Sequence, residues 1–324
     1  MDSSRKGQME FAWIFAVIVG AMILFLAFYF VGTKLIGQRY EQATIEAHSL
    51  DVLLNPFSSF GEIKILSKDE IALPQRSTLS IACNSQSNQG FGYNEITLTQ
   101  KGQAGIPRNT YEKYIFAEQS LDSKEFQVLS APFGMPWRVA DLIILWPYNQ
   151  SYCFVSAPPF ISENLGNSSS TGLNISSIHF TTNKNSCPLN SITVCFPGTG
   201  CNISVTIQSQ SSLGHKGSTT KRGSTLYFIG DALMYASIFS DKTLYNCNLQ
   251  RLMARLAGQT AVYKSKATSL AGKGCSSTFN LEAIETGADA LAKASSISES
   301  KVTEIWQDAQ NIEQQNEIAD CSLY

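Results

Sequence analysis

The first strong pattern in the chain is an apolar run that follows a short polar start. From Phe11 to Gly32 no residue carries a charge. As a helix this run would be about 33 Å long, enough to cross a hydrocarbon core of about 30 Å. A secretion signal has a shorter apolar core, of about 7–15 residues, and then a small-residue cleavage site. The pattern therefore predicts a transmembrane helix over 11–32, after a short cytoplasmic segment over 1–10.

The apolar pattern changes after the run but does not stop. Apolar residues now recur at intervals of three and four, which is typical of a helix with one apolar face; they are Ile36, Tyr40, Ala43, Ala47, Leu50 and Leu54. Pro56 should end this helix. We therefore expect an amphipathic continuation over 33–56, forming one long helix with the transmembrane segment. The alternative is an anchor and a separate short helix, with the break at Gly37.

Short alternating runs separated by turn residues fill the region 57–225 and predict a β-rich domain. Candidate strands are Glu62–Leu66, Ser77–Cys83, Asn94–Thr99, Tyr114–Ala117, Glu125–Leu129, Arg138–Trp146, Tyr152–Ser156, Asn190–Phe196 and Asn202–Gln208. Within them, Leu142–Trp146 is apolar on both faces, which predicts a central strand. Gly198-Thr-Gly200 suggests a hairpin turn, and Gly214–Ser224 suggests a polar, basic loop.

From residue 226 to residue 324 the apolar period becomes helical. The expected helices are Leu226–Ser240, Leu244–Ala271, Leu281–Ser295 with Asn280 as its N-cap, and a last helix from Ser298 to about Ala319. These amphipathic helices need an apolar partner surface, which the stripe over 33–56 could supply. The fold class is therefore α+β, with a β-rich middle and a C-terminal helical bundle packing on the N-terminal helix.

Eight cysteines follow the apolar run, and none precedes it; they are Cys83, Cys153, Cys187, Cys195, Cys201, Cys247, Cys275 and Cys321. An even number in this position favours disulfides in an oxidising compartment. Metal ligation and free buried thiols are the alternatives, although the chain has no CxxC pair and its three histidines lie far apart. We expect at least one local bridge in the β-rich region and one among the C-terminal helices, with the pairing left open.

Four N-x-S/T motifs crowd into one part of the β-rich region, at Asn149, Asn167, Asn174 and Asn202. The cluster favours a surface that faces a glycosylating compartment, and a merely polar loop region is the alternative. Together with the cysteines it places the large C-terminal part outside a cell membrane that the chain crosses once. The net charge of −2 gives no reason to expect a nucleic-acid partner.

The residues Arg5-Lys6-Gly7-Gln8-Met9-Glu10 before the apolar run resemble the signal of type IV pilins and their archaeal relatives. The resemblance implies that a prepilin peptidase cuts between Gly7 and Gln8. Glu10 would then pair with the freed amino group of a neighbouring subunit. However, the pilin acid usually stands at the fifth mature position, whereas Glu10 would be third. An acid at the membrane interface, where it reaches water at little cost, is the alternative.

A second resemblance lies further along the chain. The segments CPLNSITVCFPGTGCNISV from Cys187 and LMYASIFSDKTLYNCNLQRLMARL from Leu233, with the terminal CSLY, are similar to a family of uncharacterised archaeal membrane-anchored surface proteins. That family implies a location and an architecture, and it supplies no activity to transfer.

The sequence contains no catalytic constellation. GxSxG, HExxH, Walker A and Rossmann patterns are absent. Ser298-Glu-Ser-Lys301 fits S-x-x-K, but a helix cap explains Ser298. The basic pairs His215-Lys216 and Lys221-Arg222 could meet an anionic glycan or lipid, or simply be solvated. Arg251 and Arg255, on one helix face, could clamp a carboxylate of the helical bundle, and ion pairing within the fold is the default for both. His48 is interpreted as structural.

These patterns predict a membrane-anchored, pilin-like structural, adhesive or binding protein of the cell envelope, without catalytic activity, cofactor or metal. Its expected partners are the lipid bilayer, copies of itself or other envelope proteins, and a prepilin peptidase. The alternatives are a true filament subunit processed after Gly7, and an accessory subunit of a secretion or assembly machine.

Overall fold

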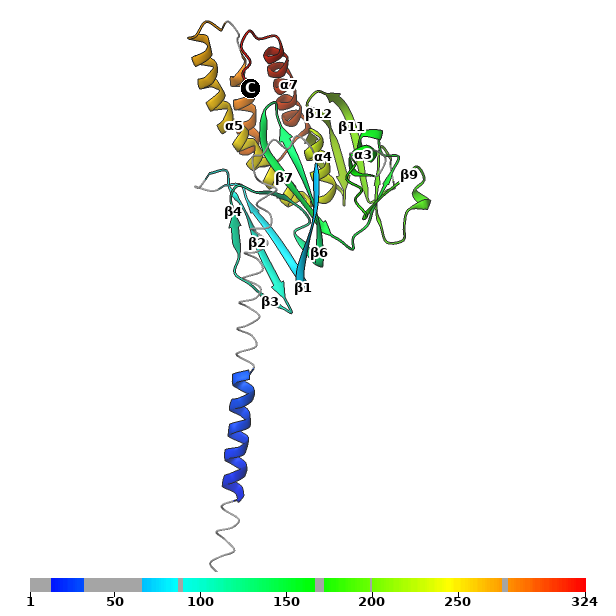
Figure 1. Ribbon diagram of the computed structural model, residues 1–324, viewed down its shortest axis with the longest axis vertical. Helices are drawn as coiled ribbons and strands as arrows, with labels where there is room; N and C mark the ends of the chain where they lie inside the picture. The colour runs from blue at the N-terminus through cyan, green and yellow to red at the C-terminus, as the bar shows by residue number, and fades with distance from the viewer. Residues whose placement is uncertain (1–12, 32–65, 87–89, 167–171, 199, 276–278) are drawn as a thin grey trace, which may run out of the picture.

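The computed structural model describes residues 13–31, 66–86, 90–166, 172–198, 200–275 and 279–324. The protein is a mixed α+β fold with an apolar helix, Trp13–Val31, near its N-terminus (Figure 1). The predicted amphipathic continuation over 33–56, with its candidate break at Gly37, lies outside the described residues, as does most of the first candidate strand. Gly7, Gln8 and Glu10 also lie outside them.

Two sheets make up the β structure. The first has the order β3-β2-β1-β6-β7-β5, with β4 also paired to β2, and the second has the order β13-β12-β11-β10-β8-β9. The strands of the first sheet are β1 (Ser67–Asn84), β2 (Tyr93–Gln100), β3 (Gln103–Ala104), β4 (Arg108–Thr110), β5 (Tyr114–Phe116), β6 (Ser120–Gly134) and β7 (Arg138–Pro147). Those of the second are β8 (Tyr152–Val155), β9 (Ile178–Thr181), β10 (Ile192–Cys195), β11 (Ile203–Ser211), β12 (Gly214–Lys221) and β13 (Ser224–Ile229).

The first sheet curls until its edge strand β5 reaches β2. The backbone N–H of Ile115 in β5 donates to the Asn94 side chain of β2 at 3.2 Å. The curl encloses a small apolar interior of its own, to which Ile143 and Leu145 of β7 belong. The alternate residues of β7 enter the main core on the outer side of the curl. The predicted central strand is therefore confirmed, because β7 is buried on both faces between β6 and β5.

Two predictions about the second sheet are wrong. The turn at Gly198–Gly200 was expected to join antiparallel strands, but β10 and β11 are parallel, with Val194 opposite Ile203. The chain loops back between them, and reciprocal bonds between Thr193 and Asn202 set the register. The polar segment Gly214–Ser224 is not a loop: it forms β12 and the start of β13. Its inward positions are polar or glycine, so the pattern of apolar residues did not reveal the strand.

The four C-terminal helices are α4 (Asp231–Phe239), α5 (Lys242–Ala271), α6 (Leu281–Ala292) and α7 (Glu299–Glu317), and a short helix α3 (Pro159–Leu165) precedes them. The expected helix Leu226–Ser240 starts late, because Leu226–Ile229 belongs to β13. Helix α4 lies between the two sheets, and every residue from Ala232 to Phe239 is buried. A helix that is apolar on all sides needs such a site. Helix α5 packs on the first sheet, and α6 and α7 continue the layer.

The helix starts show one unexpected cap. Asp241 caps α5, since its Oδ1 accepts the backbone N–H groups of Thr243 at 2.7 Å and Leu244 at 3.0 Å. The expected caps Asn280 and Ser298 do precede α6 and α7. Within the described part of the chain, however, neither side chain bonds to the backbone of its helix. Packing rather than capping therefore holds the starts of these two helices.

Candidate functional site

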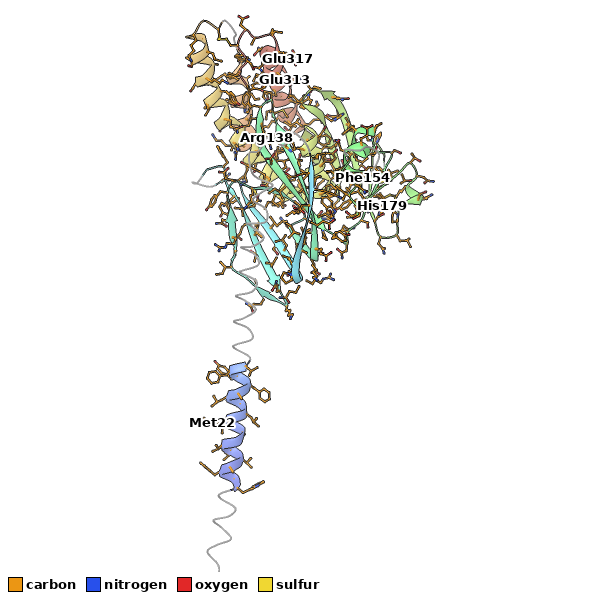
Figure 2. All side chains as sticks on the ribbon, viewed as in Figure 1. Met22, Arg138, Phe154, His179, Glu313 and Glu317 are labelled. Atoms are coloured by element: carbon orange, nitrogen blue, oxygen red, sulfur yellow. A yellow bond between two sulfur atoms is a disulfide. The ribbon has the colours of Figure 1, made fainter. Side chains whose placement is uncertain are left out.

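Trp13–Val31 is the one helix of the described chain that is long and apolar enough to cross a membrane. Side chains radiate from it on all sides, Met22 among them (Figure 2). Every side-chain-bearing residue in it is exposed, with Phe28 76% and Trp13 71% accessible. A contiguous apolar surface of this size needs lipid or a protein partner to cover it.

All eight cysteines form disulfides. Cys83–Cys247 joins β1 to α5 across 164 residues, and Cys275–Cys321 ties the end of α5 to the C-terminal segment. Cys153–Cys187 and Cys195–Cys201 tie β8 and β10 of the second sheet to the neighbouring loops, and the four cysteines pack into one small cluster. The structure thus has the expected local bridge in the β region and the expected bridge among the helices. Among the described residues no group of three His, Cys, Asp or Glu could hold a metal ion.

Three of the four candidate glycosylation asparagines lie on the surface. Asn149 follows β7, Asn174 precedes β9 with a positive φ of 46°, and Asn202 precedes β11. The Oδ1 atom of Asn202 accepts both the backbone N–H and the hydroxyl of Thr193, each at 2.9 Å. Asn167 lies outside the described residues. The exposed positions are compatible with modification, which stays a prediction.

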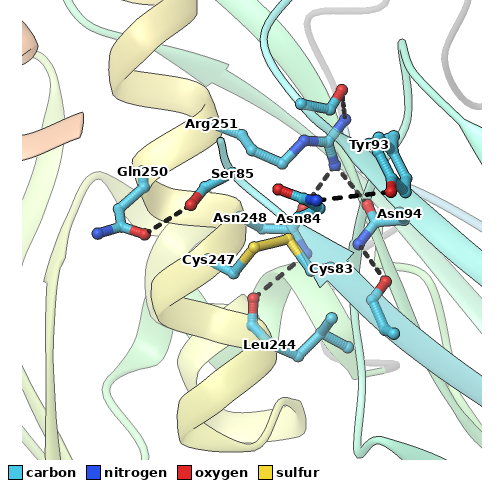
Figure 3. Close-up of a disulfide and its surroundings, with 12 residues drawn as sticks. Cys83, Asn84, Ser85, Tyr93, Asn94, Leu244, Cys247, Asn248, Gln250 and Arg251 are labelled. Carbon is cyan, nitrogen blue, oxygen red and sulfur yellow. Dashed lines mark hydrogen bonds between the residues drawn. A yellow bond between two sulfur atoms is a disulfide. The ribbon is translucent and has the colours of Figure 1, made fainter. Parts of the chain in front are cut away.

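Arg251 is the largest charged side chain that is fully buried in the described chain. The sequence pattern did not predict this burial. The guanidinium is fully buried beside the Cys83–Cys247 bridge (Figure 3). It donates to six acceptors: the carbonyls of Phe91, Gly92, Tyr111 and Lys113 and the side chains of Asn94 and Asn248. It also lies 4.7 Å from the centroid of the Tyr114 ring, within the range of a cation–π contact. Burial lowers the pKa of Arg251 to about 10, so the side chain is charged at neutral pH.

Arg251 therefore joins the first sheet to α5 instead of clamping a carboxylate. It gathers the chain segments that lead into β2 and into β5 around one side chain, next to the disulfide that links β1 to the same helix. Arg255, one turn later, does pair with a carboxylate, that of Glu112, at 2.6 Å. The expectation of ion pairing within the fold is thus met by Arg255, while Arg251 acts through carbonyl and amide oxygens.

The basic residues of the expected loop do not lie together, and each of them contacts another part of the fold. His215 contacts Asp231, and Lys216 donates to the Thr303 hydroxyl. The buried Lys221 donates to the carbonyl of Ile238 at 3.0 Å, and Arg222 pairs with Glu118 at 2.7 Å. No single basic patch forms from them in the described structure. His179, labelled in Figure 2, is exposed on β9, and three strands separate β9 from β12, which carries His215.

The S-x-x-K pair does not assemble into a reactive site. The hydroxyl of Ser298 shares a hydrogen bond with that of Ser300 at 3.1 Å, and Lys301 is exposed.

No protein-family model, curated protein or solved structure matches this chain.

Proposed function

We propose that this chain is a single-pass membrane protein whose C-terminal part faces an oxidising space outside the cell. It acts there as a structural, adhesive or binding protein of the envelope, without catalysis. One combination of features supports this most strongly: an apolar helix that no other described residue covers, and a head, the part of the chain after residue 65, whose eight cysteines are all paired. Disulfides persist in extracytoplasmic compartments and are rare in reducing ones.

The finer architecture is part of the same proposal. Residues 33–56 continue the membrane helix, and its apolar stripe packs on the C-terminal helices. The sequons at Asn149, Asn167, Asn174 and Asn202 carry glycans. The resemblance to archaeal membrane-anchored proteins and to pilin signals supports a position at the cell surface, with residues 1–10 in the cytoplasm.

A filament subunit is the second candidate, because an apolar helix that no other described residue covers can also be covered by copies of itself. In this version a prepilin peptidase removes residues 1–7, and Glu10 pairs with the new amino group of a neighbouring subunit. An accessory subunit of a secretion or assembly machine would use the same exposed helix against other membrane proteins.

The deciding measurement is the mass of the intact protein extracted from native membranes, with alkylation of free thiols before extraction. We expect no alkylated cysteine and protease access to the head from outside. Free thiols, or a head protected in intact cells, would contradict the proposed topology.

The same spectrum separates the two candidates. A start at Gln8 favours the filament subunit, and Glu10→Ala should then abolish polymerisation while leaving membrane insertion intact. A start at Met1 favours a plain anchor. If Glu10→Ala still polymerises, the pairing assigned to Glu10 is wrong.

A further inference from the structure

A cavity of about 480 Å³ lies where the two sheets meet the start of α4. Segments far apart in the chain line it: the end of β6 at Ala131–Gly134, Asn164 of α3, the β11–β12 turn at Ser212–Gly214, and Gly230–Ala232. Sites for small molecules commonly have volumes of about 300–1,000 Å³ and form between such units. The cavity is therefore large enough for a small organic molecule.

The electrostatic character of the cavity depends on one side chain. Of the described residues that line it, Asp231 is the only charged one, and its side chain is 35% accessible. The rest of the lining mixes apolar side chains such as Leu66, Phe133 and Leu213 with polar ones such as Ser212 and Tyr235. A carboxylate in a concave and partly apolar surface attracts cations and repels anions.

Two contacts hold the Asp231 carboxylate in place through a single oxygen. Oδ1 accepts the backbone N–H of His215 at 3.0 Å and lies 2.7 Å from the ring Nδ1, which therefore carries its proton. The His215 ring is buried and stacks on Phe160 with 4.1 Å between centroids. Gly214 makes this approach possible, since a Cβ there would lie 3.0 Å from Oδ1 and its φ is +98°. In the described part of the chain no hydrogen bond occupies Oδ2.

A second acceptor lines the same cavity. Asn164 donates its amide N–H to the hydroxyl of Tyr235 at 3.4 Å, which orients the amide and leaves its Oδ1 as an acceptor. The cavity thus offers a fixed carboxylate oxygen and an amide oxygen beside apolar side chains such as Phe133 and Leu213. An anion would face Asp231 without a compensating cation, and a neutral alcohol would leave the carboxylate charge uncompensated.

We propose that this cavity binds a small molecule with an ammonium group and a short apolar body. The ammonium group donates to Oδ2 of Asp231 and Oδ1 of Asn164, and the body packs on Phe133 and Leu213. The site is independent of the proposed membrane topology, because none of its described residues belongs to the N-terminal helix.

Three probes with the same apolar body and different head groups test the proposal: hexylammonium, 1-hexanol and hexanoate. Each is titrated by ligand-observed NMR against the full chain in lipid nanodiscs, with empty nanodiscs to subtract partition into lipid. Hexylammonium should bind saturably, 1-hexanol about tenfold more weakly, and hexanoate without saturation, because only the ammonium group compensates the carboxylate.

Asp231→Asn is the decisive variant, because asparagine keeps an oxygen for both His215 contacts and removes the charge. It should weaken hexylammonium binding at least about tenfold and leave 1-hexanol binding unchanged. Asp289→Asn, which removes an exposed carboxylate of α6 paired with Lys293, is the matched control and should bind as the wild type does.

If Asp231→Asn does not fold, Leu213→Trp replaces it, since Leu213 is only half-buried in a turn and a larger side chain there fills the cavity. It should abolish hexylammonium binding. Unchanged hexylammonium binding in the folded variant, equal binding of 1-hexanol or hexanoate to the wild type, or no saturable binding at all would overturn the proposal.

Discussion

At the scale of single residues, Arg251 determines how the first sheet is held to α5. Arg251→Met keeps much of the side-chain volume but leaves four backbone carbonyls without their donor. Unpaired buried acceptors and a lost buried cation should reduce the free energy of unfolding by about 3–5 kcal/mol. Urea denaturation of the full chain in detergent, followed by the near-ultraviolet circular dichroism of its aromatic residues, measures this loss.

Two further variants show whether the loss comes from this network. Arg251→Lys keeps the charge, but an ammonium group cannot match the planar fork of donors, so its loss should be intermediate. Arg76→Met removes an ion pair with Asp122 in which both side chains are exposed, 67% and 53% accessible, and should leave the free energy of unfolding nearly unchanged. Equal losses for Arg76→Met and Arg251→Met would contradict the role assigned to Arg251.

Lys221 makes stability depend on pH. Burial lowers its pKa from 10.5 to about 8 in the folded protein, whereas the unfolded chain keeps the ordinary value. Between these values the unfolded state binds more protons, so the free energy of unfolding should rise with pH. Between about pH 7.5 and about pH 8.5 the slope should rise from about 0.3 to about 1 kcal/mol per pH unit. Urea midpoints at several pH values measure it.

Lys221→Met provides the control for this pH dependence, because it fills the same buried position without a titrating group. Its unfolding free energy should be flat over that interval. The interval stays below about pH 9, where unfolded tyrosines with their ordinary pKa of 10 begin to lose protons that the buried tyrosines keep. It also stays below the range in which Arg251, whose pKa is lowered to about 10, contributes. A wild-type slope that persists in Lys221→Met would assign it to another group.

At the scale of elements, the close packing of β12 requires a glycine at position 217, which the sequence pattern does not predict. A Cβ on Gly217 would overlap the carbonyl oxygen of Thr206 and lie 2.8 Å from the Phe228 ring. The pairing of β11 with β12 shifts register beside this position. Gly217→Ala should therefore reduce the free energy of unfolding by about 1–3 kcal/mol through overpacking. The control is Ser218→Ala, at the neighbouring half-buried position, which should change the free energy of unfolding by less than about 0.5 kcal/mol. If Gly217→Ala stabilised the protein, the tight contact at Gly217 would be contradicted.

The elements that the sequence predicted well are those with an apolar signature. The apolar run Leu142–Trp146 predicts β7, and the helical period from Leu244 predicts α5. Strand β12 escaped because its buried positions are His215, Gly217, Thr219 and Lys221, whose partners come from other elements. Thr219 meets Ser237 of α4, and His215 meets Asp231, contacts that no local pattern can encode. The candidate cavity escaped for the same reason, since its residues are brought together only by the packing of the two sheets.

At the scale of the whole molecule, the four disulfides should differ in what they contribute. In the chain-entropy description a bridge stabilises by restricting the unfolded chain, and the effect grows with the length of the loop that it closes. Cys83–Cys247 closes a loop of 164 residues and Cys195–Cys201 one of 6. Removing the first pair with Cys83→Ala and Cys247→Ala should cost about 5 kcal/mol, and removing the second with Cys195→Ala and Cys201→Ala about 2 kcal/mol.

Urea unfolding of the two double variants, with the wild type alongside, measures this difference. The order should hold because the long bridge also joins β1 to α5, beside the Arg251 network that makes the same connection without a covalent bond. Without the bridge, Arg251→Lys should therefore reduce the free energy of unfolding by more than it does in the wild type. The reason is that the bridge and the Arg251 hydrogen bonds hold the same contact between the first sheet and α5, so their effects are coupled. Strictly additive losses would mean that the disulfide and Arg251 stabilise the joint independently, and a larger loss for the short bridge would mean that native packing outweighs chain entropy.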